Sequence, residues 1–260
     1  TAYEIYQCDW SSDVCSSDLT QSSSSLKNIS DFKSIDLIKP FNQLMQEQGL
    51  VDLNIIGEGE NALVDLLENN SSSVGQVDDL YNVPVSNFDD YNLDDYDYVS
   101  NVILPVTGSK GCVRQCTFCD IPEKFGRFKY RSGQHIAEEI IYLKQQYGVK
   151  NFSFTDSLIN GSLKAFKELI TALAEYNATA SQDQQIKWNG QYISRPQGQM
   201  PEYMYELMAK SGAEGLTIGL ESGSNAVLEA MNKKVKIEDV DYEMQLFEKY
   251  NISTVLLFII

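Results

Sequence analysis

The chain has 260 residues, 43% hydrophobic and 22% charged, a composition typical of a globular protein with a full core. Its formal net charge of -17 argues against a nucleic-acid partner, because phosphate binding requires clustered Lys and Arg. No apolar run approaches the roughly 20 residues that span a bilayer, so we expect no membrane partner and predict a buried strand at Ile252 to Ile260.

Residues 1–19 show no hydrophobic periodicity and lack the basic and apolar regions of a signal peptide. They resemble one translated reading frame of a common short-read sequencing adaptor, so we expect this stretch to be non-native and Cys8 and Cys15 to have no function. The three remaining cysteines cannot pair off as a disulfide framework. This count favours a reducing cytoplasm and a metal-binding role.

Residues 20–75 are predicted to be a small remnant of an N-terminal α/β domain. After a Ser-rich start, the pattern indicates a helix at Ile38 to Gln48, a strand at Val51 to Ile56 and a helix at Asn61 to Leu67. Residues 76–99 follow as an acidic stretch without the register of a calcium-binding loop, and we predict an exposed linker.

Residues 100–260 alternate strands with helices of about 10 to 15 residues, which indicates βαβ units and a parallel sheet. The expected strands are Val102 to Val106, Asn151 to Phe154, Ile186 to Tyr192, Gly215 to Ile218 and a last one from Ser253. The expected helices are Gln134 to Tyr147, Leu163 to Tyr176, Pro201 to Lys210, Ala226 to Met231 and Ile237 to Tyr250. The predicted fold class is α/β, a barrel or half-barrel with functional groups at the carboxyl ends of its strands.

Three cysteines follow the first of these strands with the spacing C-x3-C-x2-C, at Cys112, Cys116 and Cys119. Given Cys112, chance would place cysteine at both other positions on the order of once in a few thousand sequences. Thiolates spaced in this way on a loop can converge on one metal centre. Three ligands would leave one iron of a four-iron cluster open to an external ligand.

A structural zinc site is the alternative, and it would need a fourth protein ligand. The single histidine, His135, lies sixteen positions beyond Cys119, at the start of a predicted amphipathic helix. An ordinary surface role suits His135 better. A non-catalytic module that holds zinc or an iron–sulfur cluster nevertheless stays open as a second class of function.

The motif resembles that of the radical S-adenosylmethionine (SAM) superfamily, C-x3-C-x-aromatic-C, with Phe118 as the aromatic residue. The resemblance implies a partial (β/α)6 TIM-like barrel in which the cysteines hold a [4Fe-4S] cluster whose open iron binds SAM. It also implies an enzyme that cleaves SAM reductively to methionine and a 5′-deoxyadenosyl radical, with the hard chemistry supplied by the cofactors. An electron donor such as flavodoxin or ferredoxin is implied as a partner, and the substrate, small or macromolecular, is not indicated.

The same resemblance assigns roles to other residues. Phe118 would pack near the adenosyl group, and the backbone around Ile121 would read the adenine. Asp156 would pair with the methionyl amino group or, alternatively, cap the following helix. Arg195 would meet the cofactor carboxylate as a bidentate donor, unless it is an ordinary surface residue.

The run from Gly212 to Gly223 resembles a Gly-φ-Glu-Ser-Gly motif, φ being apolar, of radical enzymes with an amino-terminal cobalamin-binding domain and of their methylthiotransferase relatives. Glu221, followed by Ser222, would contact the cofactor through its ribose or amino group; a helix-start carboxylate is the alternative. Gly-Glu-Gly-Glu at 57–60 fits the same subgroup or a plain turn.

The Asp-x-His-x-x-Gly cobalamin-ligand motif is absent from the sequence. We therefore expect cobalamin, if it is used, in the full-length protein and not in this chain. Because the family core usually has six βα units, residues 100–260 are expected to be a core truncated at its C-terminus, and the resemblance does not imply activity of this fragment alone. A methylthiotransferase stays open as an alternative enzyme, although it would need further cysteines for a second cluster.

Overall fold

The computed structural model describes residues 45, 47–50, 56–68, 74–75, 80, 84–96 and 102–259. The chain divides into two units, Thr1–Gln76 and Val77–Ile260. None of the helices in the described ranges is long and apolar enough to cross a membrane. Most of the predicted helix at 38–48 and of the predicted strand at 51–56 lies outside the described residues, as does the adaptor-like stretch.

The first unit contains a short parallel pair of strands joined through a helix. Strand β1 (Ile56–Gly57) pairs with β2 (Val74–Gly75), and helix α3 (Gly59–Leu67) lies between them in the chain. Ala62, in helix α3, is buried. The helix predicted at 61–67 is therefore confirmed, with a start two residues earlier, at Gly59.

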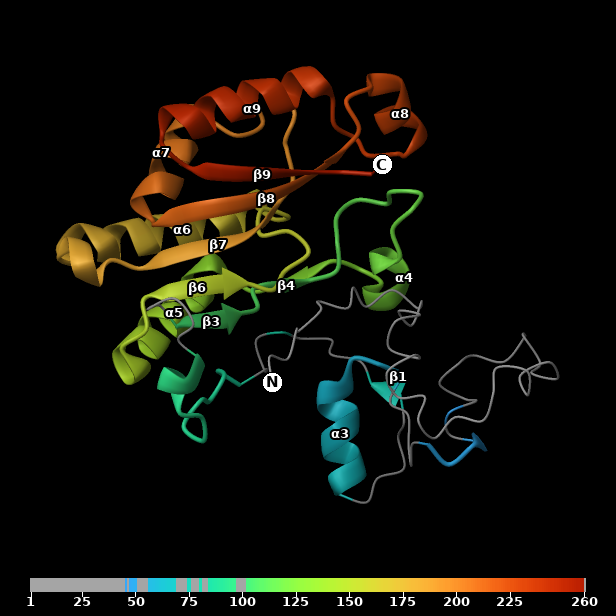
Figure 1. Ribbon diagram of the computed structural model, residues 1–260, viewed down its shortest axis with the longest axis vertical. Coiled ribbons are helices and arrows are strands. Elements are labelled where there is room, and N and C mark those ends of the chain that lie inside the picture. The colour runs from blue at the N-terminus through green and yellow to red at the C-terminus, as the bar shows by residue number, and fades with distance from the viewer. Residues whose placement is uncertain are drawn as a thin grey trace. The chain divides into compact units, whose positions relative to one another are not determined.

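The second unit is built on a five-stranded, all-parallel sheet with the strand order β3-β6-β7-β8-β9 (Figure 1). The strands are β3 (Ile103–Val106), β6 (Asn151–Phe154), β7 (Lys187–Tyr192), β8 (Ala213–Glu221) and β9 (Ser253–Phe258). All five predicted strands are confirmed, and β8 is longer than expected at both ends. Because the strands are parallel and adjacent along the chain, their carboxyl ends share one edge of the sheet.

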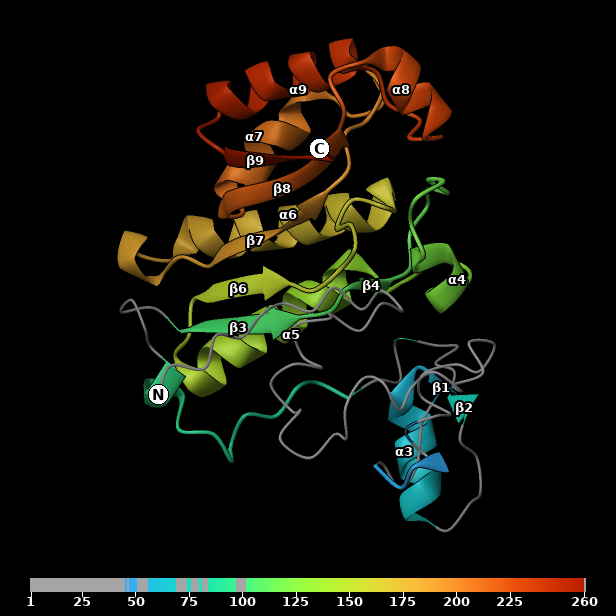
Figure 2. The same ribbon diagram turned by 45° about the vertical axis from the view of Figure 1, so that its right-hand side comes forward.

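The connecting helices are α5 (Gly133–Tyr147), α6 (Leu163–Thr179), α7 (Glu202–Lys210), α8 (Asn225–Ala230) and α9 (Ile237–Lys249). Figures 1 and 2 show α5 and α6 along one face of the sheet, and α8 beyond the carboxyl ends of the strands. Ser132 and Ser162 cap α5 and α6, because each hydroxyl accepts from the amide three residues on. Between helices and sheet lies a core with the buried rings of Phe152, Phe166 and Trp188.

Three short elements were not predicted, and they surround the cysteines. Strands β4 (Ser109–Lys110) and β5 (Lys129–Tyr130) form an antiparallel ladder, and helix α4 (Ile121–Phe125) lies between them in the chain. Two-residue strands and a five-residue helix are too short to show hydrophobic periodicity. Their existence depends on tertiary contacts that no local pattern records.

Strand β9 corrects one prediction, because it is not a buried strand. Ile252, just before it, is buried, but Val255, Leu257 and Phe258 are each about half exposed or more. Among the described residues β9 pairs only with β8, so it forms an edge of the sheet. An uninterrupted apolar run predicts burial on both faces, and here one face is covered incompletely.

Of the predicted acidic linker, the structure describes Leu80, which is buried, and residues 84–96, which are mostly exposed and end in a 3-10 turn at Leu93–Tyr96. The linker is attached to α5 through Phe88, whose amide donates to the Tyr147 hydroxyl at 3.0 Å. That hydroxyl donates in turn to Asp89 at 2.9 Å, and the rings of Phe88 and Tyr147 meet edge to face. The domain boundaries proposed from the sequence stay a prediction.

Candidate metal centre and cofactor site

The three cysteines lie on one loop at the carboxyl edge of the sheet, between β4 and α4. All three thiols are free and half-buried. The β4–β5 ladder pairs Ser109 with Tyr130 and Lys110 with Lys129, so the two ends of the cysteine-bearing segment are held together. We call residues 112–119 the cysteine loop. All three predicted metal ligands therefore lie on one loop whose two ends are joined by the β4–β5 pair.

Burial and nearby charges act on the thiols in opposite directions. Burial raises the pKa of Cys112, while the Arg114 amide, 3.4 Å from its sulfur, and the Lys233 charge lower it. Burial also raises the pKa of Cys116, and here the Lys233 charge is the strongest influence that lowers it. Lys233 and Arg114 therefore both place positive charge near the two thiols, which suits a cluster with negatively charged ligands.

Lys233 is a site residue that the sequence reading missed. Its ammonium group lies 2.7 Å from the Glu221 carboxylate in an ion pair that is mostly shielded from solvent. The same nitrogen lies over the Phe118 ring, 5.7 Å from its centroid. Two parts of the proposed site, Phe118 of the cysteine loop and Glu221 at the end of β8, thus contact one side chain. Only the run of Lys residues after α8 could have drawn attention to it.

Glu221 ends β8 in an uncommon backbone conformation. Its φ of 70° is left-handed, and the pairing of β8 with β9 shifts register between Gly219 and Glu221. Such an irregularity at the end of a strand redirects a side chain. A Cβ at Gly219 would collide with the Glu221 carboxylate and come within 3.1 Å of the Lys233 nitrogen. Gly219 therefore provides the space in which the ion pair forms.

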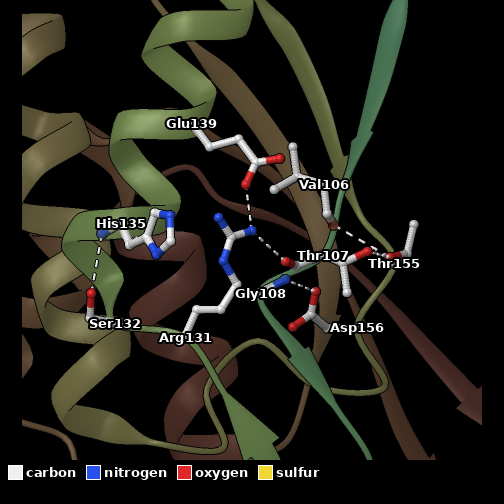
Figure 3. A network of polar contacts seen from close by, with 9 residues as sticks. All are labelled: Val106, Thr107, Gly108, Arg131, Ser132, His135, Glu139, Thr155 and Asp156. Carbon is white, nitrogen blue, oxygen red and sulfur yellow. Dashed lines mark hydrogen bonds and ion pairs between the residues drawn. The ribbon is translucent and has the colours of Figure 1, made fainter. Parts of the chain in front are cut away.

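Asp156 follows β6 and is buried, and it does not cap helix α6, whose cap is Ser162. Its carboxylate accepts from the Gly108 amide at 2.9 Å (Figure 3). It also accepts from the Ser109 hydroxyl. Burial raises the pKa of Asp156 to about 6, and these hydrogen bonds limit the rise. The helix-cap alternative is wrong, and Asp156 instead holds the segment that leads into the cysteine loop.

A second buried group unites the same segment with α5. The Arg131 guanidinium donates to the Thr107 carbonyl at 3.0 Å and forms an ion pair with Glu139 (Figure 3). The Arg131 amide also donates to the Gly108 carbonyl at 2.9 Å. His135, the candidate fourth zinc ligand, lies in this network at the start of α5, and its amide donates to Ser132 (Figure 3).

Arg195 follows β7, which ends at Tyr192 as predicted. The alternative that Arg195 is an ordinary surface residue is wrong. Its guanidinium donates to the carbonyls of Asn160 and Gly161, and its amide donates to Glu243 at 3.1 Å. Burial and the Arg114 charge lower the pKa of Arg195. Its Nε is buried without a hydrogen-bond partner. Arg195, which was predicted to bind the cofactor carboxylate, thus has one unused donor.

The remaining predicted residues lie at the same edge of the sheet. Ile121 is half-buried and begins α4 directly after the cysteine loop. Ser222 follows Glu221, and its hydroxyl accepts from the Ser224 amide at 3.3 Å. Phe118 is about half exposed, so part of its ring is open to a ligand.

Comparison with known proteins places the chain in a family. Residues 106–260, more than half of the chain, match the model of the Radical SAM superfamily. The chain therefore belongs to this superfamily of enzymes, whose cofactors are a [4Fe-4S] cluster and SAM. The sequence resemblance drawn from the cysteine motif is confirmed, as is the fold class.

Two curated relatives are similar to this chain in sequence, and one solved structure is similar to it in fold. A cytidylyl-2-hydroxyethylphosphonate methyltransferase of Streptomyces wedmorensis is 29% identical over 177 residues, 63% of this chain. A tRNA-2-methylthio-N(6)-dimethylallyladenosine synthase of Fervidobacterium nodosum is 30% identical over 132 residues, 50% of this chain. The chain spans 30% of the length of each. The cobalamin-dependent SAM radical enzyme OxsB shares the fold, with a TM-score of 0.63 at 18% identity over 84% of this chain and 34% of OxsB.

The residues present fit an iron–sulfur cluster. Three unpaired thiols share one loop, and two cations, Lys233 and Arg114, act on Cys112. Within the described part of the chain, no three His, Cys, Asp or Glu side chains are arranged to hold a single metal ion. A cluster differs from a zinc site here, since each thiolate binds a different iron and the sulfurs need not converge on one point.

Proposed function

We propose that this chain is the core of a radical SAM enzyme in which Cys112, Cys116 and Cys119 hold a [4Fe-4S] cluster. The observation that carries the proposal is the closed loop of three free thiols at the carboxyl edge of a parallel sheet. The chemistry that the cluster would supply there is one-electron cleavage of SAM to methionine and a 5′-deoxyadenosyl radical.

The chain's own residues would bind and orient the cofactor. Phe118 offers a half-exposed ring for the adenosyl group, and the backbone at Ile121 begins a helix beside it. Asp156 would hold the base of the cysteine loop and meet the methionyl amino group from there. Arg195 would direct its unused Nε toward the cofactor carboxylate.

Glu221 and Ser222 would bind the ribose or amino group of SAM from the end of β8. Glu221 is held in a left-handed backbone conformation at the edge of the sheet. Its ion pair with Lys233 fixes the carboxylate while leaving its second oxygen as an acceptor.

The location and partners follow from the same chemistry. Enzymes of this family need a reductant, and we propose an electron donor such as flavodoxin or ferredoxin for this one. We also propose a cytoplasmic location, because three free thiols are retained in a reducing compartment. The substrate, cobalamin use and overall reaction belong to the whole protein, of which this chain spans a part.

For the whole protein, the relatives support transfer of a methyl or a methylthio group. One of the two is named a methyltransferase and the other a methylthiolating synthase. We infer a methyltransferase, because the methyltransferase relative matches the larger share of this chain, 63% against 50%. A full-length protein that binds two iron–sulfur clusters would contradict this inference and support the methylthiotransferase alternative.

The proposed activity is tested by SAM cleavage in an oxygen-free preparation. After reconstitution with iron and sulfide and reduction by dithionite, 5′-deoxyadenosine is quantified by chromatography. We expect the Cys116→Ala variant to lose at least 100-fold in yield, since the cluster would lack a ligand. Cys15→Ser is the matched control and should match the parent. Equal yields from Cys116→Ala and the parent would refute the proposal.

A further inference from the structure

The segment Met231–Lys233, just after α8, is joined to the cysteine loop. The Thr117 amide donates to the Met231 carbonyl at 3.0 Å. The Asn232 side-chain amide donates to the Gln115 carbonyl at 2.7 Å, across 117 positions of sequence. Two hydrogen bonds thus connect the cysteine loop, which follows β4, to a chain segment that follows β8 and α8.

The backbone of this segment is shaped for the contact. Asn232 and Lys234 have φ values of 56° and 58°, in the left-handed region. For a residue with a Cβ this conformation costs about 1 kcal/mol or more, and such cost persists only where neighbouring contacts hold it in place. The two residues flank Lys233, so the tight turn presents that side chain.

Lys233 completes the contact from between these two residues. Its nitrogen lies 2.7 Å from the Glu221 carboxylate and 5.7 Å from the centroid of the ring of Phe118, which directly precedes Cys119. The Lys233 and Glu221 side chains are each only 14% exposed, so solvent screens their charges weakly. The Lys233 charge therefore interacts strongly with any charge on the cysteine loop.

We propose that Met231–Lys233 is a clasp that orders the cysteine loop before any cluster binds, and that Lys233 is a positioning residue that tunes the bound cluster. This inference rests on the proposed function for its second half. A thiolate-ligated cluster gains negative charge on reduction, so a nearby cation stabilises the reduced form and raises the reduction potential. Removal of the Lys233 charge should therefore make the cluster harder to reduce.

The clasp is tested first in the cluster-free chain by amide hydrogen exchange. In Lys233→Gln and in Asn232→Gly we expect peptides that cover residues 115–119 to exchange at least tenfold faster than in the parent. Glycine accepts the left-handed conformation at 232, so Asn232→Gly removes the hydrogen bond to Gln115 without new strain. Peptides from α5 serve as an internal reference and should not change. Unchanged exchange at 115–119 in both variants would overturn the clasp.

The tuning role is tested by redox titration of the reconstituted chain, monitored by electron paramagnetic resonance. Lys233→Gln should shift the midpoint potential to lower values. Lys233→Arg, which keeps the charge, should have a midpoint potential close to that of the parent. Lys234→Gln is the matched control, because it removes the same formal charge from the exposed neighbouring residue. Equal potentials for Lys233→Gln and Lys234→Gln would overturn the tuning role.

The two readouts separate this inference from the proposed function. If no cluster forms in any variant, the proposed function fails while hydrogen exchange still decides on the clasp. If the parent binds and reduces a cluster, the potential of Lys233→Gln equals that of Lys234→Gln, and exchange at 115–119 is unchanged in both Lys233→Gln and Asn232→Gly, the proposed function stands and this inference is wrong.

Discussion

At the scale of single residues, Asp156 shows how a carboxylate can serve a site without being exposed in it. It is buried, and both of its oxygens are engaged by the segment that leads into the cysteine loop. Because desolvation disfavours its charged form, the fold holds a proton on Asp156 up to about pH 6. The carboxylate therefore opposes folding at neutral pH and gains from any cation that binds beside it.

This raised pKa predicts a pH-dependent stability difference between the parent and Asp156→Asn. A carboxyl group whose pKa is higher in the folded state stabilises the fold at low pH and loses that contribution as pH rises through about 6. Between pH 5 and 7.5 the cofactor-free parent should lose about 1 kcal/mol of unfolding free energy relative to Asp156→Asn. Urea unfolding at both pH values measures the difference, and a constant or opposite difference would contradict the assignment.

The residues found from sequence and those missed differ in the range of their contacts. Cys112, Cys116 and Cys119 form a local spacing, so the motif is visible in eight consecutive positions. Lys233 depends on contacts with Glu221 and Phe118, the latter more than 100 positions away, and no local pattern carries that information. Arg131 was missed for the same reason, since its partners Thr107 and Glu139 are brought together by the fold.

At the scale of elements, helix α9 is joined to the end of β7 through one buried carboxylate. Glu243 accepts from the hydroxyls of Tyr192 and Tyr205, at 2.7 and 2.8 Å, and from the Arg195 amide. Burial raises the pKa of Glu243, and the hydrogen bonds counteract this. The position of Arg195 at the site therefore depends on a helix that contributes no ligand of its own.

We predict that Glu243→Ala destabilises the chain by about 3 kcal/mol, because two buried hydroxyls and an amide lose their acceptor. The measurement is the urea-unfolding free energy at pH 7.5. Glu248→Ala, at an exposed position of the same helix, is the control and should change it by less than about 0.5 kcal/mol. Equal effects of the two substitutions would show that the buried network does not stabilise the fold.

The packing of α5 on α6 depends on a glycine at the start of α5. A Cβ at Gly133 would collide with backbone atoms of Ala165 and Leu169 and approach the Glu168 Cβ to 2.7 Å. Backbone on both sides cannot yield as a flexible side chain would, so the two helices would have to move apart.

Gly133→Ala should therefore lower the unfolding free energy by about 2 kcal/mol, although glycine to alanine usually stabilises a helix. Thermal or urea unfolding tests the sign. Gly223→Ala, where a Cβ would meet open space, is the matched control and should be nearly neutral. A stabilised Gly133→Ala protein would contradict the close approach of the two helices.

Predicted and observed elements agree where the period of the sequence is long enough to be read. Strand β6 has the predicted limits, and helices α5 and α9 differ from prediction by one residue. Strands β4 and β5 escaped because two residues carry no period. The burial of β9 was predicted wrongly, since an apolar run records composition and not what covers the strand.

At the scale of the molecule, the parallel sheet delivers the proposed site from the ends of four consecutive strands. The cysteine loop follows β3, Asp156 follows β6, Arg195 follows β7, and Glu221 ends β8. The site is therefore built from segments that lie far apart in the sequence of the second unit. The alternation of strands and helices was enough to predict the fold class and the edge of the sheet at which the site lies. The order of βα units fixes which ends meet, whereas contacts such as the clasp form only after the sheet is assembled.

The central claim is that three cysteines hold a four-iron cluster, and the most direct measurement is the metal content of the anaerobically reconstituted chain. We predict about four irons and four sulfides per chain in the parent and in a Cys8→Ser/Cys15→Ser variant, because we expect those two thiols to have no function. Cys116→Ala should retain less than half of this iron. One zinc per chain without iron, or a full complement of iron in Cys116→Ala, would contradict the account.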